Sequence, residues 1–315
     1  MAMVGLHSIP AQPQPAPCES AAWPPPAALA PYVVGWSAFR AGGGAAVRHR
    51  LLPVNVTVLV VDVTGADRLV TGARAGYGIH ATERWREGVT VGLTPAGTAA
   101  LLGAPAREFA GATVQLADVL GRRREAELAE RLAAEREMAA RLAVVAERVG
   151  AWLAAALGGR GAAVATPAAA AGVAPDGVVA RAWRRLQRPG PRIAVPVLAE
   201  RLGVSRRYLE LRFQREIGLS PGRVARIARL QHAVGRLAAT LPYGPTDPPP
   251  YGPADPVRSG PAYAPGHPAP YDLARTAAVC GYADQPHFTR DVRELTGLTP
   301  AALCANLQYA APARR

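Results

Sequence analysis

Two segments in the last third of the chain repeat one spacing of apolar residues, glycine and proline. Each has an apolar pair four positions apart, a glycine five positions later and a proline three positions after that. The two sets are Leu209, Phe213, Gly218, Pro221 and Phe288, Val292, Gly297, Pro300. Apolar residues at i and i+4 share one face of a helix, and a glycine often follows a helix at its C-terminal end. The spacing therefore predicts a duplicated helical unit.

The residues before each apolar pair predict a second, shorter helix and a tight turn. Ala199 and Ala277 each stand four positions before a glycine, and a small side chain there lets a following helix cross closely. Gly203 and Gly281 suit a turn that needs positive φ, which is cheap only for glycine. These features are typical of helix-turn-helix units, which we expect at about 194–218 and 272–297. In each unit a polar residue, Ser205 in the first and Asp284 in the second, is placed to cap the longer helix.

The positive charge of the chain lies mostly in this same region. Residues 181–315 hold 20 arginines against nine acidic residues, a net of +11, whereas residues 1–180 have a net of only +2. A basic surface favours a polyanion because each neutralised phosphate releases condensed counterions. Charge alone would also fit an acidic membrane or RNA. Together with two helix-turn-helix units it favours double-stranded DNA, whose major groove admits one helix.

At this point the sequence resembles a known family. Residues from about 193 to 307 resemble the DNA-binding domain of the AraC/XylS family of bacterial transcription regulators, most clearly at 284–290 and 297–300. Residues 27–157 resemble, more weakly, the N-terminal domain of actinobacterial relatives, at 92–97 and 101–105. The resemblance implies an α+β protein, with a β-rich N-terminal sensor domain with helices followed by an all-α C-terminal domain with two helix-turn-helix units.

The resemblance also implies a function and partners. It implies a sequence-specific transcription regulator in the cytoplasm that binds double-stranded DNA and RNA polymerase, with a small-molecule effector and a homodimer as further expectations. Whether such a protein activates or represses stays open. The chain departs from the family in a long proline-rich stretch at 241–270 and at Leu211, where a basic residue is common.

The chain is expected to divide into four parts. Residues 1–26, rich in proline and alanine, are expected to be disordered, and 27–157 to form the sensor or dimerisation domain. Strands are expected at 54–63, 67–72 and 89–93, and two helices within 122–157, which either cover the sheet or form a dimerisation surface. A Gly/Ala/Pro linker at 158–177 leads to a DNA-binding domain at 178–310. In that domain a helix at 221–240 joins the two units, and the insert at 241–270 is expected to be disordered.

The exposed face of each longer helix supplies the candidate contacts to DNA. They are Arg206, Arg207, Tyr208, Glu210 and Arg212 in the first unit, and Gln285, His287 and Arg290 in the second. Arginine pairs with guanine, glutamine with adenine, and glutamate accepts from cytosine. Arg207 and Glu210, at i and i+3, are expected to enter the groove together, with Arg206 and Arg212 on phosphates. The alternatives are a solvated face for the arginines and a structural role for His287.

Other classes of function lack support in the sequence. Nucleophile elbows, P-loops and dinucleotide fingerprints are absent, so we expect no enzyme and no cofactor. Cys18, Cys280 and Cys304 lie far apart, so we expect no metal site. A run of 18 apolar residues and a secretory signal are also absent, so we expect no membrane partner. Trp36, Trp85 and Tyr77 either line an effector pocket or pack in the core.

Overall fold

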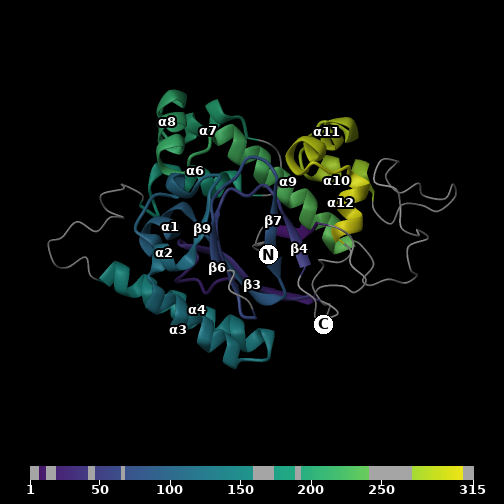
Figure 1. The fold of residues 1–315 in the computed structure, drawn as a ribbon. Coiled ribbons are helices and arrows are strands. Elements are labelled where there is room, and N and C mark those ends of the chain that lie inside the picture. The colour runs from purple at the N-terminus through teal and green to yellow at the C-terminus, as the bar shows by residue number, and fades with distance from the viewer. Residues whose placement is uncertain are drawn as a thin grey trace, which may run out of the picture.

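A computed structural model describes residues 7–11, 19–41, 47–64, 68–158, 174–188, 193–240 and 272–307. It is an α+β protein in which two antiparallel sheets precede a helical C-terminal part (Figure 1). Among the described residues, no helix combines the length and the apolar character needed to cross a membrane.

The larger sheet has six antiparallel strands in the order β2-β3-β8-β5-β6-β9. Its strands are β2 (Glu19–Trp23), β3 (Val33–Arg40), β5 (Thr57–Asp62), β6 (Arg68–Thr71), β8 (Glu87–Leu93) and β9 (Thr113–Gln115). All six residues of β5 are buried, because both faces of this central strand are covered. The strands expected at 54–63, 67–72 and 89–93 correspond to β5, β6 and β8.

The smaller sheet corrects the expectation for the N-terminus. It pairs β1 (Ser8–Pro10), β4 (Val47–Leu51) and β7 (Gly78–Trp85) in the order β1-β4-β7. The predicted disorder of residues 1–26 is therefore wrong at β1 and β2, while 1–6 and 12–18 lie outside the described residues. Such short strands are stabilised by their tertiary partners, and local composition does not reveal those partners. Ile9 in β1 is fully buried.

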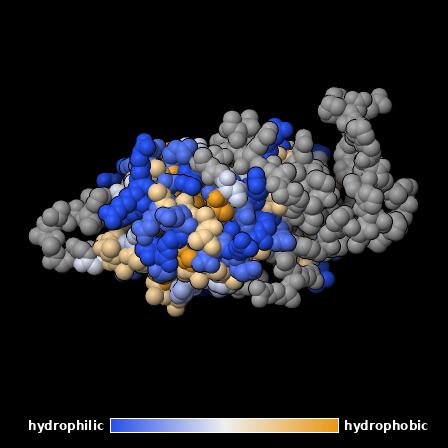
Figure 2. All heavy atoms as spheres, turned by 60° about the horizontal axis from the view of Figure 1, so that its bottom comes forward, coloured by the Kyte–Doolittle hydropathy of each residue, from blue (hydrophilic) through white to orange (hydrophobic). Residues whose placement is uncertain are grey.

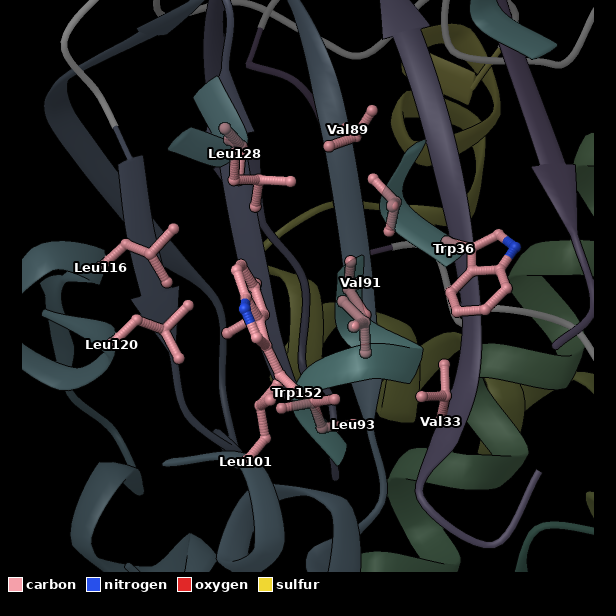
Figure 3. Close-up of a cluster of buried hydrophobic side chains, with 14 of the residues drawn as sticks. Val33, Trp36, Val89, Val91, Leu93, Leu101, Leu116, Leu120, Leu128 and Trp152 are labelled. Carbon is pink, nitrogen blue, oxygen red and sulfur yellow. The ribbon is translucent and has the colours of Figure 1, made fainter. Parts of the chain in front are cut away.

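Helices cover one face of the larger sheet. They are α1 (Pro95–Leu102), the 3-10 turn η2 (Ala106–Phe109), α2 (Leu116–Leu120), α3 (Arg122–Ala134) and α4 (Met138–Gly158). Figure 3 shows Leu101 and Trp152 of these helices beside the sheet residue Leu93 in a common apolar core. Helices α3 and α4 thus form the covering pair. Hydrophilic and hydrophobic residues are interspersed on the face that comes forward in Figure 2. A dimerisation surface stays a prediction.

The C-terminal part contains helices and turns but no strand between residues 174 and 307, as far as these are described. Its helices are α6 (Val178–Leu186), α7 (Val195–Arg201), α8 (Arg206–Glu216), α9 (Pro221–Thr240), α10 (Leu273–Val279), α11 (Gln285–Thr296) and α12 (Pro300–Leu307). The first helix pair, α7 and α8, precedes α9, and the second helix pair, α10 and α11, follows it. The helix expected at 221–240 is α9. The insert at 241–270 and linker residues 159–173 lie outside the described residues.

The N-terminal and C-terminal parts of the molecule share their interiors. Ile9 and Leu52 belong to the apolar cluster of α9 to α12, and Ala73 belongs to the cluster of α6 to α9. Polar contacts join the same surfaces, since the Trp183 indole donates to the Asn55 carbonyl at 3.2 Å. The C-terminal helices therefore use N-terminal side chains to complete their cores.

Candidate nucleic-acid interface

The first helix pair has a capped, one-sided second helix. Gly203 makes the turn with φ 69°, and the Ser205 hydroxyl caps α8 by accepting from the Tyr208 amide at 3.1 Å. Leu209 and Phe213 are completely buried on the inner face. The outer face carries polar groups because the helical period places them opposite this apolar pair.

Most charges on the outer face of α8 are paired along the helix. The Arg206 Nε donates to Glu210 Oε1 at 2.8 Å. Glu210 is therefore paired with Arg206, whereas it was expected to enter the groove together with Arg207. A side-chain pair one turn apart competes with the predicted base contact. Because both groups are exposed, this ion pair is weak, at about 0.3–0.5 kcal/mol. Arg207 is exposed at the start of the helix.

Arg212 has a structural partner that the sequence analysis missed. Its Nε donates to Glu216 Oε1 at 2.8 Å, and its guanidinium lies 5.7 Å from the centre of the Tyr208 ring. Glu216 is buried, and burial raises the pKa of its carboxyl although Arg212 opposes that rise. The i,i+4 spacing of Arg212 and Glu216 was the available signal. Arg212 is thus held along α8, whereas a phosphate contact was expected.

The second helix pair repeats this construction. Gly281 makes the turn with φ 76°, and Asp284 caps α11 by accepting from the His287 amide at 2.6 Å. Phe288 and Val292 are completely buried, in the places that Leu209 and Phe213 occupy in the first pair. The matched spacing of the sequence therefore corresponds to matched burial.

The predicted contact residues of α11 differ in their surroundings. Gln285 and Arg290 are exposed. His287 is half-buried, and its Nδ1 accepts from the Ala283 amide at 3.4 Å. Its ring also meets the Tyr282 ring edge-on, with centroids 5.3 Å apart. These contacts favour the structural role for His287 that the sequence left open.

Ion pairs fasten the second helix pair to α9. Arg226 donates to Glu294 with both terminal nitrogens and, through Nε, to Asp291 Oδ1 at 2.8 Å. Arg229 reaches Asp291 at 3.5 Å and lies 4.6 Å from the centre of the Tyr282 ring. Asp291 is buried, so these arginines offset the desolvation of its charge. This cluster could not be predicted from the sequence, because the paired arginines and Asp291 lie more than 60 positions apart.

The N-terminal part touches the C-terminal end of both α8 and α11. Arg107 donates to the Arg215 carbonyl in the last turn of α8 at 3.1 Å. Arg50 donates to the carbonyl of Thr296, the last residue of α11, at 3.0 Å. A cation near the carbonyls at a helix C-terminus is favourable, because these carbonyls lack partners within the helix. The two parts of the molecule therefore meet at equivalent points of the duplicated units.

An arginine-rich hollow of about 380 Å³ lies beside the first helix pair. It is lined on the α6 and α7 side by Arg181, Arg184, Arg185, Arg188 and Arg201. The excess of positive charge from residue 181 onward is visible in the sequence, but the gathering of these five arginines around one hollow is not. They extend the basic surface next to α8.

The remaining expectations concern cofactors, metals and the aromatic residues. Within the described residues, no cluster of three His, Cys, Asp or Glu side chains could hold a metal ion. Cys280 and Cys304 are buried and in no disulfide among the described residues, and Cys18 lies outside those residues. Trp36 and Trp85 are buried in apolar clusters. Tyr77 is exposed and stacks with Arg50 beside α11. In comparisons with known proteins, no family model matches the chain and no curated protein matches it significantly.

Proposed function

We propose that this chain is a sequence-specific regulator of transcription that binds double-stranded DNA, with α8 and α11 as its two recognition helices. The observation that carries the proposal is the repeated construction of these helices. Each follows a glycine turn, has a side-chain cap at its start, and buries an apolar pair while presenting polar side chains outward. A helix-turn-helix unit needs these properties to insert one helix into a major groove.

The placement of the two helices supports a shared DNA surface. Figure 1 shows both helix pairs on the same side of the molecule, with α9 between them and α3 and α4 on the opposite side. Helix α9 has 20 residues, a length of about 30 Å. Successive major grooves on one face of a duplex are about 34 Å apart. The cluster of Arg226 and Asp291 fixes the second pair on α9, so the spacing does not depend on the insert at 241–270.

The exposed residues then divide into two kinds of contact. Within the described residues, Arg207 on α8 takes no part in the ion pairs of Glu210 and Arg212. We assign Arg207, together with Gln285 and Arg290 on α11, to base edges. Arg206, Tyr208 and two arginines of α6, Arg181 and Arg185, are assigned to phosphates, which position the protein without reading sequence. Glu210 and Arg212 act by holding Arg206 and Tyr208 in place.

We assign the N-terminal part a regulatory role, because Arg107 and Arg50 connect it to both recognition helices. A small-molecule effector fits that role. RNA polymerase as a partner and a homodimer rest on the family resemblance alone.

The test uses the full chain and duplexes selected from a random pool. We expect recovery of a preferred sequence, and an affinity that falls steeply with salt because several phosphates are contacted. Arg290→Ala and Arg207→Ala should each weaken binding to the selected duplex by about 10- to 100-fold, the usual effect of losing one base contact.

The control is Arg123→Ala, which removes the same charge from an exposed position on α3, on the far side of the molecule. It should leave affinity nearly unchanged. A flat salt dependence, or equal effects of Arg123→Ala and Arg290→Ala, would contradict the proposal.

A further inference from the structure

A cavity of about 540 Å³ lies between the N-terminal and C-terminal parts. One side is apolar and comes from the strand β3 and the segment before β5, through Val33, Val34, Val54 and Val56. The opposite side comes from α6, α9 and α10. A volume of this size is typical of sites for small organic molecules.

The polar side of the cavity is positively charged. Arg184 of α6, Arg188 just after α6 and Arg236 of α9 line it, together with His232. None of the described residues that line it is acidic. The three arginines have no carboxylate partner among the ion pairs of the described residues. A cavity with one apolar side and one cationic side suits a molecule that has an apolar body and an anionic group.

Two buried donor atoms on the cavity lining have no hydrogen-bond partner among the described residues. They are Gln187 Nε2 and Arg236 Nε, both of which are donors. A buried donor without a partner is destabilising, and a charged one more so. An acceptor in the cavity would satisfy these donors, and a carboxylate would also neutralise the arginine.

We propose that this cavity binds a small organic anion, a carboxylate with an apolar body, whose carboxylate meets Arg236 and Arg188 and whose body packs on the valines of the N-terminal part. The site touches α6, which packs with the first helix pair, α10, which belongs to the second pair, and α9, which lies between the pairs in the chain. A ligand there contacts both sides of the junction, so its binding stabilises one relative placement of the two helix pairs. The binding is independent of the proposed function, and only its effect on DNA rests on that function.

The binding test uses the full chain and three probe anions, benzoate, 2-naphthoate and octanoate, each with its matched neutral alcohol. We expect at least one anion to raise the melting temperature and, by calorimetry, to bind about tenfold more tightly than its alcohol, because charged hydrogen bonds are stronger than neutral ones. If none of the three anions binds more tightly than its alcohol, the proposal is wrong.

Variants locate the site. Arg236→Gln combined with Arg188→Gln should abolish the preference for the anion, whereas Arg223→Gln should retain it, since Arg223 is exposed on α9 and does not line the cavity. An equal loss in both would show non-specific attraction and overturn the proposal. Anion binding that appears only after deletion of residues 245–265 would assign the cavity to that segment and would also overturn it.

A last measurement separates this proposal from the proposed function. With the selected duplex, a saturating anion should change DNA affinity by about fivefold or more, the usual size of a coupling between sites. Specific anion binding by a chain that binds no DNA would sustain the cavity and refute the DNA-binding role. Anion binding with unchanged DNA affinity would refute the coupling.

Discussion

The two helix pairs share one spacing and one pattern of burial, yet they hold their charges differently. In the first pair the acidic residues of α8 are paired within the helix, Glu210 with Arg206 and Glu216 with Arg212. In the second pair the acidic residues of α11, Asp291 and Glu294, are paired with Arg226 on another helix. The same backbone plan therefore has local ion pairs in one copy and long-range ion pairs in the other.

This difference indicates how each pair is fixed to the rest of the molecule. The first pair belongs to an apolar cluster with α6, in which Trp183 is buried. The second pair is also packed on α9, but the ion pairs of Arg226 and Arg229 define its position around that helix. Removing one arginine should therefore affect the second pair far more than the first.

The largest expected effect is that of Arg226→Ala. The change removes the closest partner of the buried Asp291 and both hydrogen bonds to Glu294, while Arg229 remains 3.5 Å from Asp291. Breaking a largely buried pair is strongly destabilising, and since Arg226 is partly exposed we expect a loss of about 2–3 kcal/mol. Urea unfolding followed by circular dichroism measures the free energy of unfolding.

The matched change in the first pair is Arg206→Ala, which breaks only the exposed pair with Glu210. The expected loss is below about 0.5 kcal/mol. Equal losses in the free energy of unfolding of Arg226→Ala and Arg206→Ala would show that the long-range ion pairs stabilise the molecule no more than the local ones.

These contacts also explain how far the sequence could predict the structure. The starts of α8 and α11 follow from local rules. The caps Ser205 and Asp284, and the turn glycines Gly203 and Gly281, act within a few residues of each helix. The β-branched run of β5 and the two-helix break before Met138 are local patterns as well. The α+β class and the construction of the helix pairs could therefore be predicted.

The rest depends on partners distant in sequence. The strand β1 is held by β4 and by burial of Ile9 against the C-terminal helices, neither of which is visible in a proline-rich segment. The cluster of Arg226 with Asp291 joins α9 to α11 across the insert. Likewise, nothing in the sequence around Arg236 indicates a cavity, because its opposite side comes from β3 and the segment before β5. Contacts between segments distant in sequence, and not local propensity, decide these features.

A smaller effect distinguishes the contacts of the N-terminal part with each pair. Gly218 and Gly297 have positive φ, so alanine at either position costs about 1 kcal/mol in backbone strain. At Gly218 an added Cβ would also meet the Ala110 Cβ at 2.7 Å and the Arg107 Cα at 3.1 Å. At Gly297 it would meet the end of the exposed Tyr77 ring at 2.6 Å, and that side chain is able to swing away.

We therefore expect Gly218→Ala to lower the free energy of unfolding by about 1 kcal/mol more than Gly297→Ala, because a methyl and a backbone atom yield less readily than a ring at the surface. Urea unfolding of both variants makes the comparison. Gly297→Ala in a chain that also carries Tyr77→Ala is the control, and it should lose no more stability than the backbone strain. A larger loss in Gly297→Ala than in Gly218→Ala would mean that Tyr77 is held more firmly than Ala110.

The smallest expected effect concerns acidification: as the pH falls, the contribution to stability of Glu216 in the first pair increases, whereas that of Glu294 in the second pair decreases. Burial raises the pKa of Glu216 in α8, whereas the hydrogen bonds from Arg226 lower the pKa of Glu294 in α11. A carboxyl with a raised pKa binds protons more readily in the folded state, so its contribution to stability increases as the pH falls toward the ordinary value near 4.3. A carboxyl with a lowered pKa contributes stability above that value and loses it as the pH falls further.

Urea unfolding at several pH values between 7 and 3.5 tests this difference. As the pH falls, the free energy of unfolding should decrease less steeply in Glu294→Gln than in the unchanged protein, and more steeply in Glu216→Gln. The slopes of the free energy of unfolding against pH should differ by only a few tenths of a kcal/mol per pH unit, since Glu294 is largely exposed. Changes of the same sign in both variants would show that the two carboxylates respond to pH in the same way. The two helix pairs would then differ in the positions of their ion pairs but not in their electrostatic effect.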